Sequence, residues 1–381
     1  MKDRETGVSL HACGNYAPAA LDKAVEACLA DLGADEFFRP GMKVVLKPNL
    51  VMKRRPEEAT TTHPEVAAAV TRALRRRGVT DILLADSPGG LYTPGTLGGI
   101  YAASGMGEAA SAGFRLNLDT SYENRQAQGA VRCHSFDIIK PLCEADLIIN
   151  LCKLKTHAMT GLSGACKNMF GAVPGLKKPE LHCQFPQPEA FGEMLVDLCA
   201  MLAPALTIVD GVECMEGNGP TGGTPRHMGL LAAGRNPFSL DLILCRLIGI
   251  DPAAVPTCRA AIARGLCPDS PEKVETAGEP PEKFAASFRL PDSRSVDFTD
   301  RLPGFLQKPA AAALRQAAPR PAVRTDTCIG CGKCAESCPQ KIIGIRSGKA
   351  HIRRRGCIRC YCCHEMCPVR AIDLKRFRLF R

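Results

Sequence analysis

The sequence predicts two folded domains of different class. The first is a large α/β domain, residues 1–265, with a mostly parallel sheet and helices on both faces, and the second is a small C-terminal α+β domain, residues 321–381. Strand and helix patterns alternate through the large domain, and its strands are near-continuous apolar runs, which is typical of strands covered on both faces. The small domain is predicted because one four-cysteine pattern occurs twice in it. Residues 266–320 are rich in proline and are predicted to be a linker that packs partly on the large domain.

The predicted strands of the large domain cover residues 41–46, 81–85, 146–150, 206–209 and 228–232. Between the first two, residues 61–78 predict a helix. Thr62 and Glu65 have the spacing of a capping box, Pro64 falls in the first turn and Gly78 follows a basic last turn. A strand, a helix and a strand in this order predict a parallel pair joined by a right-handed crossover.

Polar, glycine-rich motifs follow four of these strands. They are Lys47-Pro48-Asn49, Asp86-Ser87-Pro88-Gly89-Gly90, the run from Lys153 to His157, and the run from Asp210 to Pro220. Ligands of open α/β sheets bind outside the carboxyl ends of the strands, so we expect the four motifs to converge on one site.

The stretch 151–171, LCKLKTHAMTGLSGACKNMFG, indicates what this site binds. Its first two lysines and His157 are expected to leave a buried strand directly into the crevice. Gly161 and Gly164 allow close backbone approach before a helix that carries Lys167 and Asn168. A helix N-terminus with lysines beside it suits a carboxylate or a phosphate. The spacing of a P-loop is absent, so the stretch does not predict ATP binding.

The predicted site has ligand-binding and catalytic members. The ligand-binding residues are Lys47, Asn49, Asp86, Ser87, Lys153, Lys155, Lys167 and Asn168, and the catalytic candidates are His157, Asp210 and Glu216. A histidine among lysines has a lowered pKa, which makes His157 a neutral acid/base candidate near pH 7. The alternatives are structural: Lys153 and Lys155 as solvated lysines at a strand end, His63 as a helix-start residue, and Asp86 and Asp210 as acceptors for loop amides. The G-x-G-x-x-A match at Gly105 follows no clear strand and favours a small-residue helix over a dinucleotide site.

The two cysteine runs, CIGCGKCAESCP and CIRCYCCHEMCP, have the spacing C-x2-C-x2-C-x3-C-P, in which the fourth cysteine of each run binds the other run's [4Fe–4S] cluster. The expected ligands are Cys328, Cys331, Cys334 and Cys367 for one cluster, and Cys357, Cys360, Cys363 and Cys338 for the other. Zinc is the alternative, but two complete runs exceed what a tetrahedral zinc site needs. Cys362 has no place in this scheme, and most of the other cysteines are expected to be small buried residues.

The small domain resembles bacterial two-cluster ferredoxins over about 60 residues, and it carries the chain's excess positive charge. Residues 320–381 contain 15 Lys or Arg against 4 Asp or Glu, while the whole chain has a net charge of +10. This basic surface indicates either a docking face for an acidic redox partner protein or counter-charge for the anionic clusters. Nucleic acid is not an expected partner, because no aromatic stacking residues are interleaved with the basic ones and Trp is absent.

Five motifs of the large domain, KPNLV, TTHPE, ADSPGG, KLKTH with TGLSGACKNMFG, and VDGVECMEGNGPTGG, resemble the family known as domain of unknown function 362. The resemblance covers about residues 44–249, and many members of that family carry a two-cluster ferredoxin tail. It implies an architecture and a site more firmly than a reaction. Cys152 stands where the family pattern has proline and Cys166 lies beside Lys167, and either thiol is a packing group or an additional metal ligand.

Two functions fit these observations, and the sequence leaves open whether the chain is an enzyme. The first is an electron-transfer oxidoreductase that acts on a small anionic ligand in the crevice. The second is an iron–sulfur carrier or electron-delivery protein that matures or reduces a partner enzyme. A binding domain with a ferredoxin attached and no chemistry of its own is a third. The chain has no apolar run that spans a bilayer and no signal peptide, so a reducing, oxygen-poor cytoplasm is the expected location.

Overall fold

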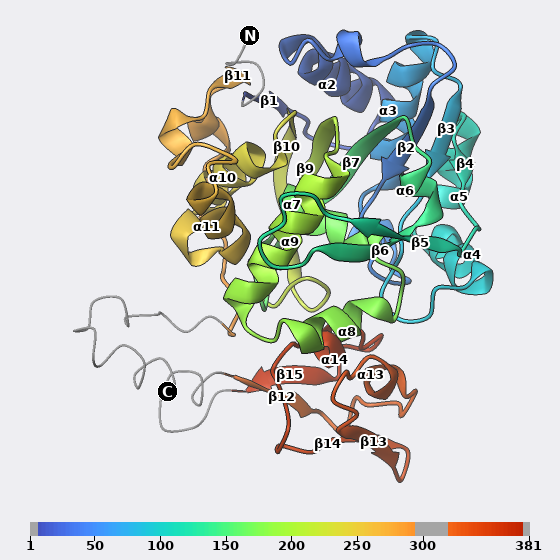
Figure 1. Ribbon diagram of the computed structural model, residues 1–381, viewed down its shortest axis with the longest axis vertical. Helices are drawn as coiled ribbons and strands as arrows, with labels where there is room; N and C mark the ends of the chain where they lie inside the picture. The colour runs from blue at the N-terminus through green and yellow to red at the C-terminus, as the bar shows by residue number, and fades with distance from the viewer. Residues whose placement is uncertain (1–6, 294–318, 376–381) are drawn as a thin grey trace.

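The computed structural model describes residues 7–293 and 319–375 (Figure 1). The large domain is built on a nine-stranded mixed sheet. In spatial order its strands are β11 (Thr276–Gly278), β1 (Val8–Ala12), β10 (Thr224–Gly234), β9 (Leu206–Glu216), β7 (Leu147–His157), β2 (Lys43–Lys47), β3 (Asp81–Leu84) and β4 (Arg115–Leu116), and β8 (Gly161–Ser163) pairs with β7 beside this path.

The sheet is mostly parallel, as predicted. Strands β9, β7, β2, β3 and β4 run parallel to one another, and β11 runs parallel to β1. Strand β10 runs antiparallel to both of its neighbours, β1 and β9, and β8 runs antiparallel to β7. The βαβ unit predicted for residues 41–85 is confirmed by the parallel pairing of β2 with β3. A further antiparallel pair, β5 (Tyr122–Gln126) with β6 (Ser135–Ile139), lies outside the main sheet.

Helices cover both faces of the sheet (Figure 1). One face packs on α2 (Pro18–Asp31), α3 (Pro64–Arg76), α4 (Pro94–Ala103) and α5 (Met106–Ala109). The other packs on α6 (Lys140–Cys143), α7 (Ala165–Asn168), α8 (Lys177–Gln184), α9 (Pro188–Leu202), α10 (Pro237–Ile248) and α11 (Pro256–Ala263). Successive side chains of β2 point to opposite faces of the sheet. Val44 and Leu46 therefore belong to the core on the first face, and Val45 belongs to the core on the second.

The start of α3 differs from the predicted capping box. The N-cap is His63, whose Nδ1 accepts a hydrogen bond from the backbone N–H of Glu65, which confirms the helix-start alternative for this histidine. Thr62 instead donates its hydroxyl to the carbonyl of Leu151 at 2.7 Å. The hydroxyl of Thr62 therefore connects this loop to β7, and the N-cap of α3 is one residue later than predicted.

Strands β7 and β9 are longer than predicted, and this changes the position of the motifs that follow them. Both have 11 residues, so the run from Lys153 to His157 and the run from Asp210 to Glu216 continue the strands. Polar residues do not end a strand here because their buried side chains find partners inside the sheet: Lys153 Nζ lies 2.9 Å from Asp210 Oδ2 on the neighbouring strand.

Part of the predicted linker belongs to the large domain. Strand β11 pairs with β1, and the buried Phe284 and Phe288 pack in the core beside α10. This packing is in line with the expectation that the segment lies partly on the large domain, because a proline-rich segment can still add an edge strand and short turns. Residues 294–318 of the predicted linker lie outside the described part of the chain.

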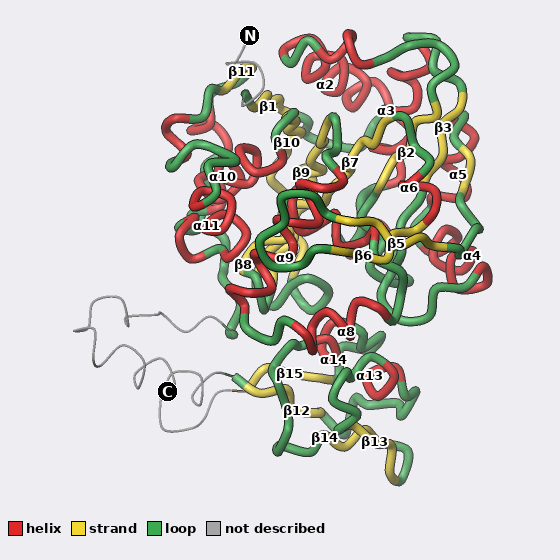
Figure 2. Tube along the Cα trace, in the orientation of Figure 1, coloured by secondary structure: helices red, strands yellow, loops and turns green. Residues whose placement is uncertain are grey.

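The small domain contains short elements separated by turns (Figure 2). Strand β12 (Arg320–Val323) pairs with β15 (Ile372–Lys375), and β13 (Ile343–Arg346) pairs with β14 (Lys349–Ile352), all antiparallel. The two cysteine runs form equivalent short helices, α13 (Lys333–Glu336) and α14 (Cys362–Glu365). The predicted α+β class of this domain is confirmed.

The small domain is docked on the large one through α14 and the turn that follows it. Arg54 donates to the backbone carbonyls of Cys367 and Pro368, both at 3.2 Å, and Glu58 accepts from Arg370 at 3.0 Å. On the other side of α14, the hydroxyl of Thr221 donates to the carbonyl of Glu365 at 2.9 Å. Loops of the large domain thus hold the second cysteine run directly over the ends of the central strands.

Candidate functional site

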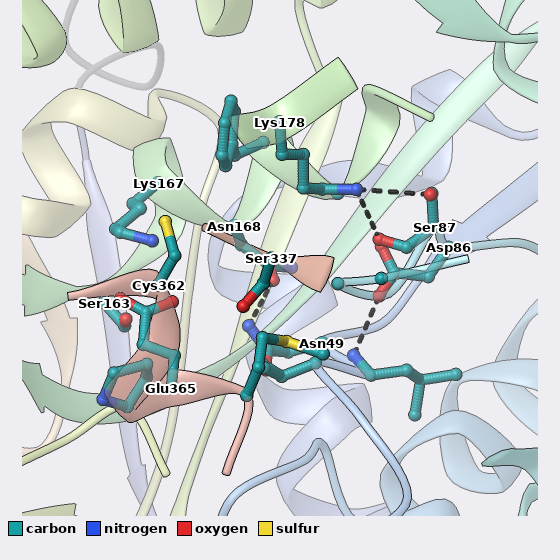
Figure 3. Close-up of a pocket in the computed structure, with 18 of the residues that line it drawn as sticks. Asn49, Asp86, Ser87, Ser163, Lys167, Asn168, Lys178, Ser337, Cys362 and Glu365 are labelled. Atoms are coloured by element: carbon teal, nitrogen blue, oxygen red, sulfur yellow. Dashed lines mark hydrogen bonds between the residues drawn. The ribbon is translucent and has the colours of Figure 1, made fainter. Parts of the chain in front are cut away.

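A pocket lies between the two domains, at the carboxyl ends of β2 and β3 and beside β7 (Figure 3). It encloses about 770 Å³ of space, including its mouth. Seven predicted ligand-binding residues line it, namely Lys47, Asn49, Asp86, Ser87, Lys155, Lys167 and Asn168. The predicted convergence of the first three motifs therefore occurs, because parallel strands bring their carboxyl ends to one edge of the sheet.

Lys47 and Asp86 form a buried ion pair at the base of the pocket. Lys47 Nζ lies 2.7 Å from Asp86 Oδ1 and also donates to the carbonyl of Pro48, and the other carboxylate oxygen accepts the backbone N–H of Leu50 at 2.8 Å. Burial lowers the pKa of Lys47, and Asp86 opposes that effect. Gly171 passes so close that a Cβ there would strike both groups of the pair. Only glycine leaves enough space at position 171 for the ion pair. The ion pair in turn stiffens the base of the pocket.

Amide side chains and Lys155 form a second network. Lys155 Nζ donates to Asn49 Oδ1 at 2.9 Å and to the carbonyl of Thr60 at 2.6 Å. The Asn49 amide donates to Asn168 Oδ1, and Asn168 donates to Asn150 Oδ1, both at 2.7 Å. Burial and the nearby Lys167 hold the pKa of the Lys155 ammonium well below its usual value. The network fixes the orientation of every amide that faces the pocket.

The N-terminus of α7 is closed by an internal carboxylate, which corrects the expectation of a ligand there. Asp241 accepts the backbone N–H groups of Ala165 at 2.6 Å and Cys166 at 3.0 Å. Gly164 has no room for a Cβ because that atom would strike Asp241. The small residue before the helix therefore makes space for a carboxylate of the protein itself, and the anion that α7 stabilises is Asp241.

Lys167 is the cation of α7 that faces the pocket. Among the described residues its Nζ has no hydrogen-bond or ion-pair partner within bonding distance, and it lies 5.8 Å from the centre of the Phe170 ring. Burial lowers its pKa, while Glu365 and Cys362 act against that shift. Its three N–H donors are therefore available to a ligand.

Two further residues of the pocket, Lys178 and His182, were missed by sequence reasoning. Lys178 Nζ donates to the carbonyl and hydroxyl of Ser87 and to two further carbonyls, and burial lowers its pKa to about 7. His182 stacks on Phe191 with ring centres 4.2 Å apart, has an unpartnered Nδ1 within the described structure, and has a pKa lowered by burial to about 3. Both lie on α8, whose pattern KKPELHCQ carries no strand or motif signal.

The small domain supplies the remaining side of the pocket with Ser337, Cys362, Glu365 and Met366. Figure 3 shows Lys167, Ser163, Cys362 and Glu365 grouped on one side, and Lys178, Ser87 and Asp86 on the other. Glu365 Oε1 lies 3.2 Å from His157 Nε2 without the alignment of a hydrogen bond. Burial would raise the pKa of this carboxyl, but the neighbouring His157 and Lys167 lower it to about 2.

His157 is placed behind Glu365 and does not line the pocket. Its Nδ1 accepts backbone N–H groups from Met159 at 3.0 Å and Thr160 at 3.2 Å, so in the neutral ring the proton is on Nε2, the atom that faces Glu365. Burial and Lys167 lower its pKa to about 4, so the ring is neutral at pH 7 as expected. Its contacts are with the carboxylate and the chain, and they position Glu365.

Three other predicted residues also lie away from the pocket. Lys153 and Asp210 are fully buried, and Asp210 additionally accepts the hydroxyl of Tyr16 and the backbone N–H of His63, both at 2.8 Å. Glu216 pairs with Arg226 at 2.7 Å and accepts the backbone N–H of Arg289. These three side chains lie outside the pocket because each has its partners within the sheet or beyond it.

Eight of the nine cysteines in the two runs line two separate cavities of the small domain. One cavity, of about 310 Å³, is lined by Cys328, Cys331, Cys334 and Cys367, and the other, of about 330 Å³, by Cys338, Cys357, Cys360 and Cys363. Each grouping takes its fourth cysteine from the other run. In the described residues, no three His, Cys, Asp or Glu side chains are arranged around a single metal ion. Thiols spaced around a cavity fit a cluster, whereas zinc needs four ligands drawn to one point.

The remaining cysteines are mostly packing groups. Of the thirteen outside the two cavities, ten are buried, including Cys152 and Cys166, each of which packs in one of the large domain's cores. Cys362 is different because it lines the pocket between the domains. Packing is thus the role supported for Cys152 and Cys166.

The fold and the cysteine-lined cavities define an iron–sulfur protein with a large α/β domain. Residues 44–246 match the family described as domain of unknown function DUF362, and the chain belongs to this family. Residues 320–368 match a 4Fe-4S dicluster domain. The suspected fusion of these two units is confirmed, and the chain binds iron–sulfur clusters.

A curated relative and a solved structure are also similar to the chain. A thylakoid-associated protein of Synechocystis is 35% identical over 294 residues, which cover 75% of this chain and 88% of that protein. The lactate racemase apoprotein of Thermoanaerobacterium thermosaccharolyticum superposes with a TM-score of 0.41 at 17% identity, over 65% of this chain and 58% of that chain. In the described ranges no helix has the length and apolar character needed to cross a membrane.

Proposed function

We propose that the protein is an iron–sulfur oxidoreductase that acts on a small anionic ligand held between its two domains. The observation that carries this proposal is the shared pocket: lysines at the strand ends of the α/β domain form one side, and residues of the second cysteine run form the other. A carboxylate is the favoured anion, and phosphate is the alternative. A redox partner with an acidic surface would fit the basic small domain, and a reducing cytoplasm would suit its free cysteines.

We assign one [4Fe–4S] cluster to each four-cysteine cavity, with the ligands given above. When bound, such clusters supply single electrons at low potential. Cys360 and Cys363 line one of the cavities, while Cys362 between them lines the pocket. The α14 segment is therefore the part of the chain that separates a predicted cluster from a predicted ligand.

Different residues of the pocket would bind the ligand, orient it and transfer protons. Lys167 binds the anion, because its ammonium faces the pocket without a hydrogen-bond partner in the described structure. Asn49 and Asn168 orient the ligand, since both amides are fixed by the Lys155 network. Lys178 holds or releases a proton near neutral pH, because its pKa is about 7.

Native mass spectrometry of protein purified without oxygen tests this function, together with calorimetric titration using propionate as the anion probe. We expect eight iron atoms per chain and propionate binding that falls at least about tenfold in Lys167→Ala, because an unpaired charged donor is lost. Lys177→Ala is the matched control, since this lysine lies outside the pocket and pairs on the surface with Asp137. Equal affinities in wild type and Lys167→Ala would refute the proposal.

An iron–sulfur carrier or electron-delivery protein remains the second candidate, favoured by the basic charge of the small domain. In that case iron–sulfur cluster or electrons would pass to an apo-protein partner. Retention of all eight iron atoms after incubation with a partner purified alongside it, and no reduction of that partner, would exclude this function.

A further inference from the structure

Glu365 is a carboxylate placed inside a site that otherwise suits anions. Its side chain is 15% exposed, and the domain contacts of α14 hold its backbone over the pocket. Two carboxylates line the pocket in the described structure, and they differ in their partners. Asp86 is neutralised by Lys47 at 2.7 Å, whereas among the described residues no lysine or arginine forms an ion pair with Glu365. A carboxylate that is not directly bonded to a cationic side chain of the described residues therefore faces the ligand space.

The positive groups of the pocket are also unequal. Lys155 and Lys178 donate to oxygen atoms of the protein, so their amino groups have few free N–H donors. Lys167 has all of its donors available to a ligand, and Figure 3 shows its nitrogen on the same side of the pocket as Glu365. A ligand anion bound to Lys167 would thus lie near the Glu365 carboxylate.

Apolar side chains from both domains also line the pocket. Leu50, Val51, Phe170 and Pro220 of the large domain and Met366 of the small domain contribute to it. For a ligand held at Lys167, a second negative group is unfavourable wherever it faces Glu365 or these apolar side chains, because burial of an unpaired charge is costly. An apolar substituent would instead be buried with a gain in free energy.

We infer that Glu365 makes the pocket selective for singly charged carboxylates with an apolar portion, and that it excludes doubly charged anions. This inference rests on the proposed function and names the ligand class of the same pocket. Selectivity is then a property of the docked pair of domains, because the large domain supplies the cations and the small domain supplies the excluding charge. His157 positions Glu365 through the contact at 3.2 Å.

Propionate and malonate test the inference, because they have the same number of carbon atoms and differ by one carboxylate. Their dissociation constants are measured at pH 7 by calorimetry on the full, iron-loaded chain. In wild type we expect propionate to bind at least about tenfold more tightly than malonate, since a like charge within a few ångströms costs more than 1.4 kcal/mol at moderate screening. In Glu365→Gln the preference is expected to shrink about tenfold.

Glu336→Gln is the matched control, since Glu336 occupies the equivalent position in the first cysteine run and is exposed. Glu365→Asp keeps the charge and is expected to keep the preference, and iron content of each variant shows whether the small domain is intact. An unchanged preference in a Glu365→Gln variant that has full iron and binds propionate would overturn the inference alone. A wild type that binds neither anion would overturn the proposed function, and with it this inference.

Discussion

Asp210 is expected to stabilise the large domain and to have no part in ligand binding. Its carboxylate is fully buried and accepts three hydrogen bonds, one of them from the buried Lys153 ammonium at 2.9 Å. Asp210→Asn would leave that ammonium without a counter-charge. Removing one partner of a buried ion pair costs about 3–5 kcal/mol. With about 2–4 °C of Tm per kcal/mol for a large domain, the Tm is expected to fall by roughly 10 °C.

Thermal unfolding of the iron-loaded chain, followed by circular dichroism, measures this loss. Asp269→Asn is the control, because its carboxylate pairs with Lys273 at the surface with 62% of the side chain exposed. Such pairs contribute about 0–1 kcal/mol. The reasoning would be refuted if both variants lost the same stability. Loss of propionate binding in Asp210→Asn without loss of stability would restore a role for this residue in the site.

Two further predictions concern the pocket. The affinity for propionate is expected to fall as the pH rises from 6 to 8, because the Lys178 pKa of about 7 means that its positive charge is lost over this range. Lys178→Met should bind more weakly and show a flat profile in the same titration, and a profile identical to wild type would contradict this assignment. Cys362→Ser is expected to retain eight iron atoms per chain, whereas Cys363→Ser should lose part of its iron, as measured by iron and sulfide analysis. Equal losses in the two variants would show that Cys362 is a cluster ligand.

The sequence was informative where a simple rule of sheet geometry decides the outcome. More than 120 positions of the chain separate Lys47 from Asn168, and Asp86 lies between them in sequence. The three residues nevertheless meet in one pocket, because each follows or adjoins the carboxyl end of a parallel strand. The grouping of the cysteines into two cavities was predictable for a similar reason, since the spacing of the runs is short and specific.

The sequence misled where polar residues continue a strand. Lys153 and Asp210 are charged residues of the kind found in loops, but each can be buried because it pairs with the other. The sequence around either residue does not reveal this pairing. The same limit applies to Gly164, whose small size serves Asp241 from a distant helix. Pairings between segments far apart in the chain decided these positions, so periodicity and motif spacing could not reveal them.

The docking of the small domain was also outside the reach of sequence patterns. Nothing in the spacing of the second run shows that Glu365 would face His157, or that Arg54 would hold the carbonyls of Cys367 and Pro368. Lys178 and His182 were missed because α8 becomes part of a site only when the small domain covers it. Surface complementarity between two folded units produced these contacts.

The internal duplication of the small domain has diverged in its use. Helices α13 and α14 begin from equivalent sequence runs, but α14 presents Cys362 and Glu365 to the large domain where α13 has Lys333 and the exposed Glu336. A generic two-cluster ferredoxin could therefore replace the first repeat more readily than the second. The small domain as a whole could not be exchanged for another ferredoxin domain, because its second cysteine run is specific to the large domain that it contacts.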